Sequence, residues 1–113
     1  MSKNRKKIIL VSSFRPRECG IATFSKDLSE SLKKYTKDFN VEVIPIDEPG
    51  GENRQYPKSI KHRISQNDKK SYLEAAKYIN KSNAVALSIQ HEYGLYGGES
   101  GDNVLSMLKN IKI

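Results

Sequence analysis

Three short runs of mostly β-branched and aliphatic residues limit most strongly what this 113-residue chain can fold into. They occupy residues 7–13 (KIILVSS), 40–46 (NVEVIPI) and 85–89 (VALSI). The first and third runs lack apolar–polar alternation, which is typical of strands buried on both faces of a parallel sheet. Segments with helical periodicity separate the runs, and strands that alternate with helices predict βαβ units. We therefore expect one domain with a Rossmann-like α/β fold, a mainly parallel sheet and flanking helices.

The segments between the runs carry the apolar stripes of amphipathic helices. The first helix is predicted to start at Ile21, the second to run from an N-cap at Asn67 or Asp68 to about Lys81, and the third to begin at Asp102. The side chains expected to face the core are Ile21, Phe24, Leu28, Leu32 and Tyr35, then Tyr72, Ala75, Ala76 and Ile79, and finally Val104, Leu105, Leu108 and Ile111. Residues 54–66 show no clear pattern, although 59–64 could form a short strand.

The net charge of +7 favours anionic partners. Much of it comes from a basic N-terminal tail and from lysines spread along helix faces, where they serve solubility. Nucleic acid is not an expected partner, because the sequence has no recognition-helix or RNP-type motif. Peripheral contact with an anionic membrane stays open. A single cysteine, Cys19, fits a reducing compartment, and no apolar run has the length of a signal-peptide core or a membrane span, so we expect a cytoplasmic protein.

Two unusual segments follow the first and third runs. Residues 15–20 (RPRECG) are broken by proline and glycine, and residues 90–98 (QHEYGLYGG) combine a polar triplet with three glycines. If the run 85–89 lies beside the run 7–13 in the sheet, the strand order reverses between them. Ligands of open α/β sheets bind at such a reversal, beyond the carboxyl ends of the strands. We therefore predict a site where these two segments face each other.

The glycines of both segments suit anion binding. Gly20 lets the backbone approach a ligand closely and opens a helix, whose first N–H groups and positive dipole end accept phosphate. Arg15 and Arg17 could add charge-assisted hydrogen bonds, and Gly97 and Gly98 could form a backbone nest for an anion or a sugar hydroxyl. The alternatives are a tight strand-to-helix turn with exposed arginines and a plain glycine-rich turn. Neither dinucleotide nor P-loop fingerprints are present.

His91 and Glu92 stand at the tip of the third run. An imidazole there could donate a hydrogen bond or act as a general acid or base, and the adjacent carboxylate favours this functional interpretation over a structural histidine. A metal site is not expected, because His62 is the only other histidine and Cys19 the only cysteine. No cofactor is predicted.

Two motifs resemble those of a known family. Residues 15–24 (RPRECGIATF) and 88–101 (SIQHEYGLYGGESG) are similar to the N-terminal domain of group 1 (family 4) retaining glycosyltransferases, where bacterial members read roughly RECGIATF and QHEFGIFGG. Residues 72–80 (YLEAAKYIN) resemble the helix between the two motifs. The resemblance covers most of the chain, with the motifs in the family's order.

The family has the GT-B architecture, in which two Rossmann-like domains enclose the active site. The resemblance implies that Gly20, with Cys19 and Ile21 beside it, lies against the diphosphate of a nucleotide-sugar. It places His91 near the transferred sugar, as the catalytic residue. It assigns the acceptor side to Arg17, Glu92, Gly97 and Gly98. Enzymes of this type need no bound metal, because helix N-termini and basic side chains stabilise the leaving diphosphate.

The chain departs from the family in extent. Residues 1–113 correspond to part of the N-terminal, acceptor-side domain, and nothing in them corresponds to the C-terminal nucleotide-sugar domain with its paired glutamates. We expect this chain to be inactive alone. Its parent protein would transfer a hexose, such as mannose, to a saccharide or lipid-linked acceptor with retention. The alternatives are a non-catalytic basic module that binds an anionic partner, and another two-domain enzyme such as a sugar-nucleotide epimerase.

Overall fold

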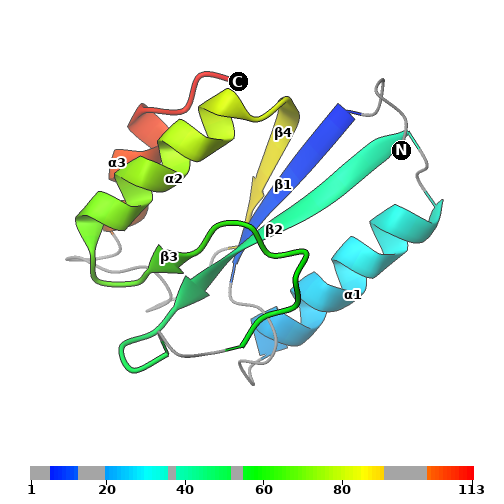
Figure 1. Ribbon diagram of the computed structural model, residues 1–113, viewed down its shortest axis with the longest axis horizontal. Coiled ribbons are helices and arrows are strands. Elements are labelled where there is room, and N and C mark those ends of the chain that lie inside the picture. Colours follow the sequence, from blue (N-terminus) through cyan, green and yellow to red (C-terminus); the bar gives the residue numbers. More distant parts are fainter. Residues whose placement is uncertain (1–5, 13–19, 36–37, 52–54, 91–101) are drawn as a thin grey trace.

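The fold was analysed in a computed structural model, which describes residues 6–12, 20–35, 38–51, 55–90 and 102–113. Within these residues the chain forms an α/β structure in which strands and helices mostly alternate (Figure 1). The elements are β1 (Lys6–Ser12), α1 (Gly20–Tyr35), β2 (Phe39–Asp47), β3 (Ile64–Ser65), α2 (Lys69–Lys81), β4 (Ala84–Ile89) and α3 (Asp102–Lys109). The predicted runs and helices are all present, and the strand in the weakly patterned segment is only two residues long.

The four strands form one parallel sheet in the order β3-β2-β1-β4. Val11 of β1 is paired with Ile44 of β2 on one side and with Ile89 of β4 on the other. The chain therefore builds outward from β1 to β3 and then returns to the opposite side of β1 for β4. This arrangement confirms the predicted Rossmann-like α/β fold.

Helices cover both faces of the sheet, with α1 on one face and α2 and α3 on the other (Figure 1). Under α1 lies a small cluster of Leu10, Val41 and Val43, against which Leu28 and Leu32 of the helix pack as predicted. The larger cluster lies under α2 and α3, and its members are Ile9, Val11, Ile44, Ile46, Ile64, Tyr72, Ala75, Ala76, Ile79, Ala84, Val104 and Met107. Alternate residues of β1 and β2 thus contribute to opposite cores, because successive strand side chains point to opposite faces.

Helix α2 has the start that the sequence predicts. The side chain of Asp68 accepts a hydrogen bond of 3.1 Å from the backbone N–H of Lys70, as an N-cap does. At the other end the backbone N–H of Ser82 donates to the carbonyls of Tyr78 and Ile79. Such caps satisfy terminal backbone groups that have no partner inside the helix. No described helix has the length and apolar character needed to cross a membrane.

Helix α3 begins at Asp102 as predicted, but its buried face differs from the prediction. Val104 and Met107 are buried, whereas Leu105 is 51% exposed and Leu108 is 41% exposed. The prediction that both leucines face the core is therefore wrong. The helix packs against α2, and part of its apolar stripe stays exposed.

Strand β4 is the outermost strand of the described sheet next to β1. The register shifts there, because Lys7 is paired with Ala84 while Ile8 is paired with Ala86. The skipped residue, Val85, is 52% exposed. The prediction of a strand buried on both faces is therefore wrong for β4, since Val85 and Ala86 are exposed at an edge position beside the bulge.

Candidate functional site

The order of the strands reverses between β1 and β4. These strands are parallel neighbours, and the backbone N–H of Gln90, just after β4, donates to the carbonyl of Val11 over 2.9 Å. Their carboxyl ends therefore lie side by side at one edge of the sheet. This confirms the predicted position of the run 85–89 beside the run 7–13. Segments 13–19 and 91–101 consequently leave the sheet from neighbouring points.

The three described helices begin at the same edge, and α1 and α3 directly follow the two motif segments. Helix α1 connects two parallel strands, so it runs opposite to them and its first residue, Gly20, lies at the carboxyl edge (Figure 1). Helix α3 starts at Asp102, and the side chain of Asn103 reaches the carbonyl of Gln66, just beyond β3, over 3.5 Å. The first turns of helices have N–H groups without intrahelical partners and carry the positive dipole end. The edge at the strand reversal therefore offers hydrogen-bond donors to an anion.

The structure describes only some of the predicted site residues. Gly20 is the first residue of α1, as predicted for a helix-opening glycine. Ile21 belongs to the first turn of that helix, but its side chain lies outside the described part. The other members lie outside the described residues altogether, and they are Arg17, Cys19, His91, Glu92, Gly97 and Gly98. The structure thus gives the ends of both segments and leaves the side-chain roles as predictions.

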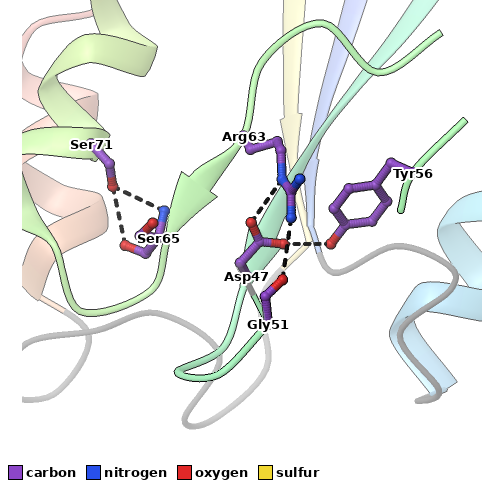
Figure 2. Close-up of polar contacts among 6 residues, drawn as sticks. All are labelled: Asp47, Gly51, Tyr56, Arg63, Ser65 and Ser71. Atoms are coloured by element: carbon purple, nitrogen blue, oxygen red, sulfur yellow. Dashed lines mark hydrogen bonds and ion pairs between the residues drawn. The ribbon is translucent and has the colours of Figure 1, made fainter. Parts of the chain in front are cut away.

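A polar cluster at the end of β2 was not predicted from the sequence. Asp47 is the last residue of β2, and its carboxylate is 5% exposed. The hydroxyl of Tyr56 donates to Oδ1 over 2.7 Å, and Nε of Arg63 donates to Oδ2 over 2.9 Å (Figure 2). Nη2 of Arg63 also donates to the carbonyl of Gly51 over 3.2 Å, and the guanidinium carbon lies 4.6 Å from the centre of the Tyr56 ring.

This cluster fixes the long connection between β2 and β3. An acidic residue at the end of the second strand is the position from which dinucleotide-binding folds bind a ribose. Here both carboxylate oxygens of Asp47 already accept hydrogen bonds from Tyr56 and Arg63, so the carboxylate serves the fold. The only sequence signal was an acid directly after a strand. Nothing in the spacing links it to an arginine sixteen residues later.

A second polar cluster lies on the α2 face of β2. The buried carboxylate of Glu42 accepts a hydrogen bond from the hydroxyl of Tyr78 and lies 3.3 Å from Nζ of Lys7. The ring of His62 stacks on Tyr78 with centroids 4.8 Å apart. Burial raises the pKa of the Tyr78 hydroxyl, and the hydrogen bond to Glu42 and its charge add to the effect. Burial lowers the pKa of His62, opposed by the charges of Glu74 and Glu42.

The position of this second cluster argues for a structural role. Glu42 is paired with Ile9 in the first half of β2, away from the carboxyl edge. The other members of the cluster come from β1, from α2 and from the connection before β3. The cluster therefore holds that connection and the helix against the sheet, and a phenol kept neutral remains a hydrogen-bond donor at neutral pH.

A groove of about 320 Å³ lies beside the C-terminal half of α2. Its lining residues are Leu73, Ala76, Lys77, Asn80, Asn110 and Lys112. The side chain of Asn80 bridges it, because Nδ2 donates to the carbonyl of Asn110 over 2.7 Å and Oδ1 accepts from the N–H of Lys112 over 2.8 Å. Helix α2 runs opposite to the strands, so its C-terminal half lies at the amino edge. The groove is therefore remote from the strand reversal, and its amide groups fasten the segment after α3.

Across the described ranges, no three side chains of His, Cys, Asp or Glu come together as metal ligands would. Comparison with models of protein families, with curated proteins and with solved structures found no match to this chain.

Proposed function

We propose that this chain is the acceptor-side part of a retaining glycosyltransferase with GT-B architecture. Its parent would transfer a hexose from a nucleotide-sugar to a saccharide or lipid-linked acceptor. One observation carries the proposal: β1 and β4 are neighbours, so the two segments that resemble the family's motifs leave the sheet from adjacent points. This geometry supports a shared site, because ligands of open α/β sheets bind at such a reversal.

In the proposed site the first turn of α1 faces the diphosphate of the donor. Gly20 would let that diphosphate approach the backbone, with Cys19 and Ile21 beside it, because a glycine adds no Cβ. The N–H groups and the dipole would stabilise the negative charge that grows on the diphosphate as the glycosidic bond to the donor breaks. Arg15 would add a charge-assisted hydrogen bond, whereas Arg17 would line the acceptor side.

The segment after β4 would hold the sugar and the acceptor. His91 would lie near the transferred sugar and orient the reacting centre through a hydrogen bond from its imidazole. Glu92, Gly97 and Gly98 would line the acceptor side. A GT-B enzyme completes its cleft with a second Rossmann-like domain, so we expect this chain alone to bind a donor weakly and to transfer no sugar.

The proposal is tested by the binding of GDP-mannose and UDP-glucose to this chain, followed by NMR. We expect dissociation constants in the millimolar range, where about 4 kcal/mol of binding free energy is available. Arg15→Ala should weaken binding about tenfold, the effect of one charge-assisted hydrogen bond. Lys81→Ala, on an exposed position at the C-terminal end of α2 and so at the opposite edge of the sheet, removes the same charge elsewhere and is the matched control.

Two outcomes would contradict the proposal. Equal weakening by Arg15→Ala and Lys81→Ala would mean that the net charge of +7 attracts the donor without a defined site. Binding of DNA or RNA that is stronger than donor binding and falls steeply with salt would favour the alternative of a basic module for an anionic polymer.

A further inference from the structure

A tight turn follows β2 at the carboxyl edge of the sheet. In residues 48–51 (EPGG) the backbone N–H of Gly51 donates to the carbonyl of Glu48 over 2.9 Å. Pro49 is the second residue of the turn, and Gly50, the third, has a φ of 88°. A proline followed by a glycine with positive φ is the pattern of a type II turn. The sequence therefore favours a single conformation of this turn, although Pro49 and Gly50 are exposed.

The turn lies beside the end of β1, where the strand order reverses. Ser12, the last residue of β1, is paired with Pro45 of β2, and β2 continues to Asp47. Neighbouring strands are about 4.8 Å apart. The turn starts directly after Asp47, so it borders the end of β1 on the side opposite to β4. Ligands of open α/β sheets bind beyond such strand ends, and the turn therefore adjoins the proposed ligand site.

Arg63 holds both ends of this turn (Figure 2). Its Nε donates to the carboxylate of Asp47, directly before the turn, and its Nη2 donates to the carbonyl of Gly51, the last residue of the turn. Tyr56 contacts both members of the ion pair, since its hydroxyl donates to Asp47 and its ring lies beside the guanidinium of Arg63. Binding residues are often placed on loops that a rigid scaffold positions. The contacts of Arg63 give an exposed turn such a scaffold.

We infer that residues 48–51 form a wall of the ligand site at the carboxyl edge, and that Arg63 is the positioning residue of this wall. The inference rests on the proposed function, because it assigns the turn to the site that takes the nucleotide-sugar. Arg63 acts through the turn and does not contact the ligand. A wall that is fixed before binding loses little conformational freedom when the ligand arrives, and this strengthens binding.

The binding of GDP-mannose to the 113-residue chain, followed by NMR, tests the role of Arg63. Arg63→Lys keeps the positive charge but lacks the planar fork that joins Asp47 to Gly51. We expect its dissociation constant to be about fivefold higher than that of the wild type, because the loosened turn must be ordered on binding. Tyr78→Phe removes a polar contact to Glu42, in the first half of β2, and is the matched control. It should change the dissociation constant less than about twofold, because it lies away from the site.

Substitutions of Gly50 test the turn without removing a contact of Arg63. A Cβ added at Gly50 meets no atom within 4 Å, so neither Gly50→Asn nor Gly50→Ala introduces a clash. Asparagine adopts a positive φ more readily than alanine does. Gly50→Ala should therefore disturb the turn more and raise the dissociation constant about threefold, whereas Gly50→Asn should raise it less.

Two results would overturn the inference and leave the proposed function intact. One is wild-type affinity in Arg63→Lys while Arg15→Ala still binds weakly, which would leave Arg63 without a role in binding beyond its charge. The other is equal affinity in Gly50→Ala and Gly50→Asn, which would show that the shape of the turn does not matter. A wild-type chain that binds neither GDP-mannose nor UDP-glucose near Gly20 would overturn the inference and the proposed function together.

Discussion

The two sides of the sheet are stabilised by different means. On the β3 side, a long connection is tied down by buried polar contacts, with Arg63 on the carboxylate of Asp47 and His62 stacked on Tyr78. On the β4 side, Val85 of the outer strand is exposed, and so is part of the apolar surface of α3. The described part of the first side is held together by these contacts. The second combines the strand reversal with open surface, so we expect ligands and partners there.

The largest effect on stability is expected from Asp47→Ala. The substitution removes the carboxylate that pairs with Arg63 and leaves a half-buried guanidinium without it. We expect a loss of about 3 kcal/mol in the free energy of unfolding, measured with urea. Glu30→Ala breaks the exposed pair of Lys26 and Glu30 in α1 and is the control, with an expected loss of about 0.5 kcal/mol. Similar losses in the two variants would refute the structural role of Asp47.

Helix α3 offers the next test, because truncation of its buried apolar residues should destabilise the fold more than truncation of its exposed ones. Met107→Ala empties a fully buried position and should cost about 2.5 kcal/mol. Leu105→Ala truncates an exposed side chain and should cost about 0.5 kcal/mol or less. Both are measured by urea unfolding. A larger loss for Leu105→Ala than for Met107→Ala would reverse the assignment of the helix faces.

The polar contact on the α2 face should contribute less. Tyr78→Phe removes the hydroxyl that donates to Glu42, and a hydrogen bond to a charged acceptor is worth about 2 kcal/mol. Tyr72→Phe removes a donor to the neutral carbonyl of Gln66 and should cost about 1 kcal/mol. The two unfolding free energies form a matched pair, and a Tyr78→Phe loss no greater than that of Tyr72→Phe would contradict the charged character of this contact.

The smallest effect is a pH dependence from His62. Its pKa in the folded protein lies below the ordinary 6.5 because of burial, so the unfolded chain binds the proton first as the pH falls. Stability contributed by the neutral ring is therefore present above 6.5 and is lost as the pH falls toward the folded pKa. The urea midpoint should drop more between about pH 7.5 and about pH 5 in the wild type than in His62→Asn. Parallel pH profiles of the urea midpoint in the two proteins would show that His62 does not contribute to the pH dependence of stability.

The elements were predictable from the sequence because their signals are local. Apolar runs marked β1, β2 and β4, and Asp68 and Asp102 marked the starts of two helices. The polar clusters were not predictable, because Glu42 and Tyr78 are thirty-six residues apart and meet only through the tertiary fold. The exposure of Leu105 was missed for a related reason. A helical stripe shows which residues are apolar, but not whether a neighbouring element covers them.

The sequence predicted which strand ends lie beside the candidate site, but not how the side chains of the site are arranged. The two motif segments were predicted to follow neighbouring strands. The pairing of β1 with β4 brings the starting points of those segments together as expected. The roles of Arg17 and His91 depend on side-chain positions that strand pairing does not determine. Those roles stay predictions.

We propose that this chain binds its ligand at the carboxyl edge of β1 and β4. Backbone amide chemical shifts, recorded while GDP-mannose is added, test it most directly. We expect the largest changes at Val11, Ser12, Gly20 and Gln90, which surround the strand reversal. Changes centred on Asn80 and Asn110 at the opposite edge, with none at the reversal, would contradict the claim.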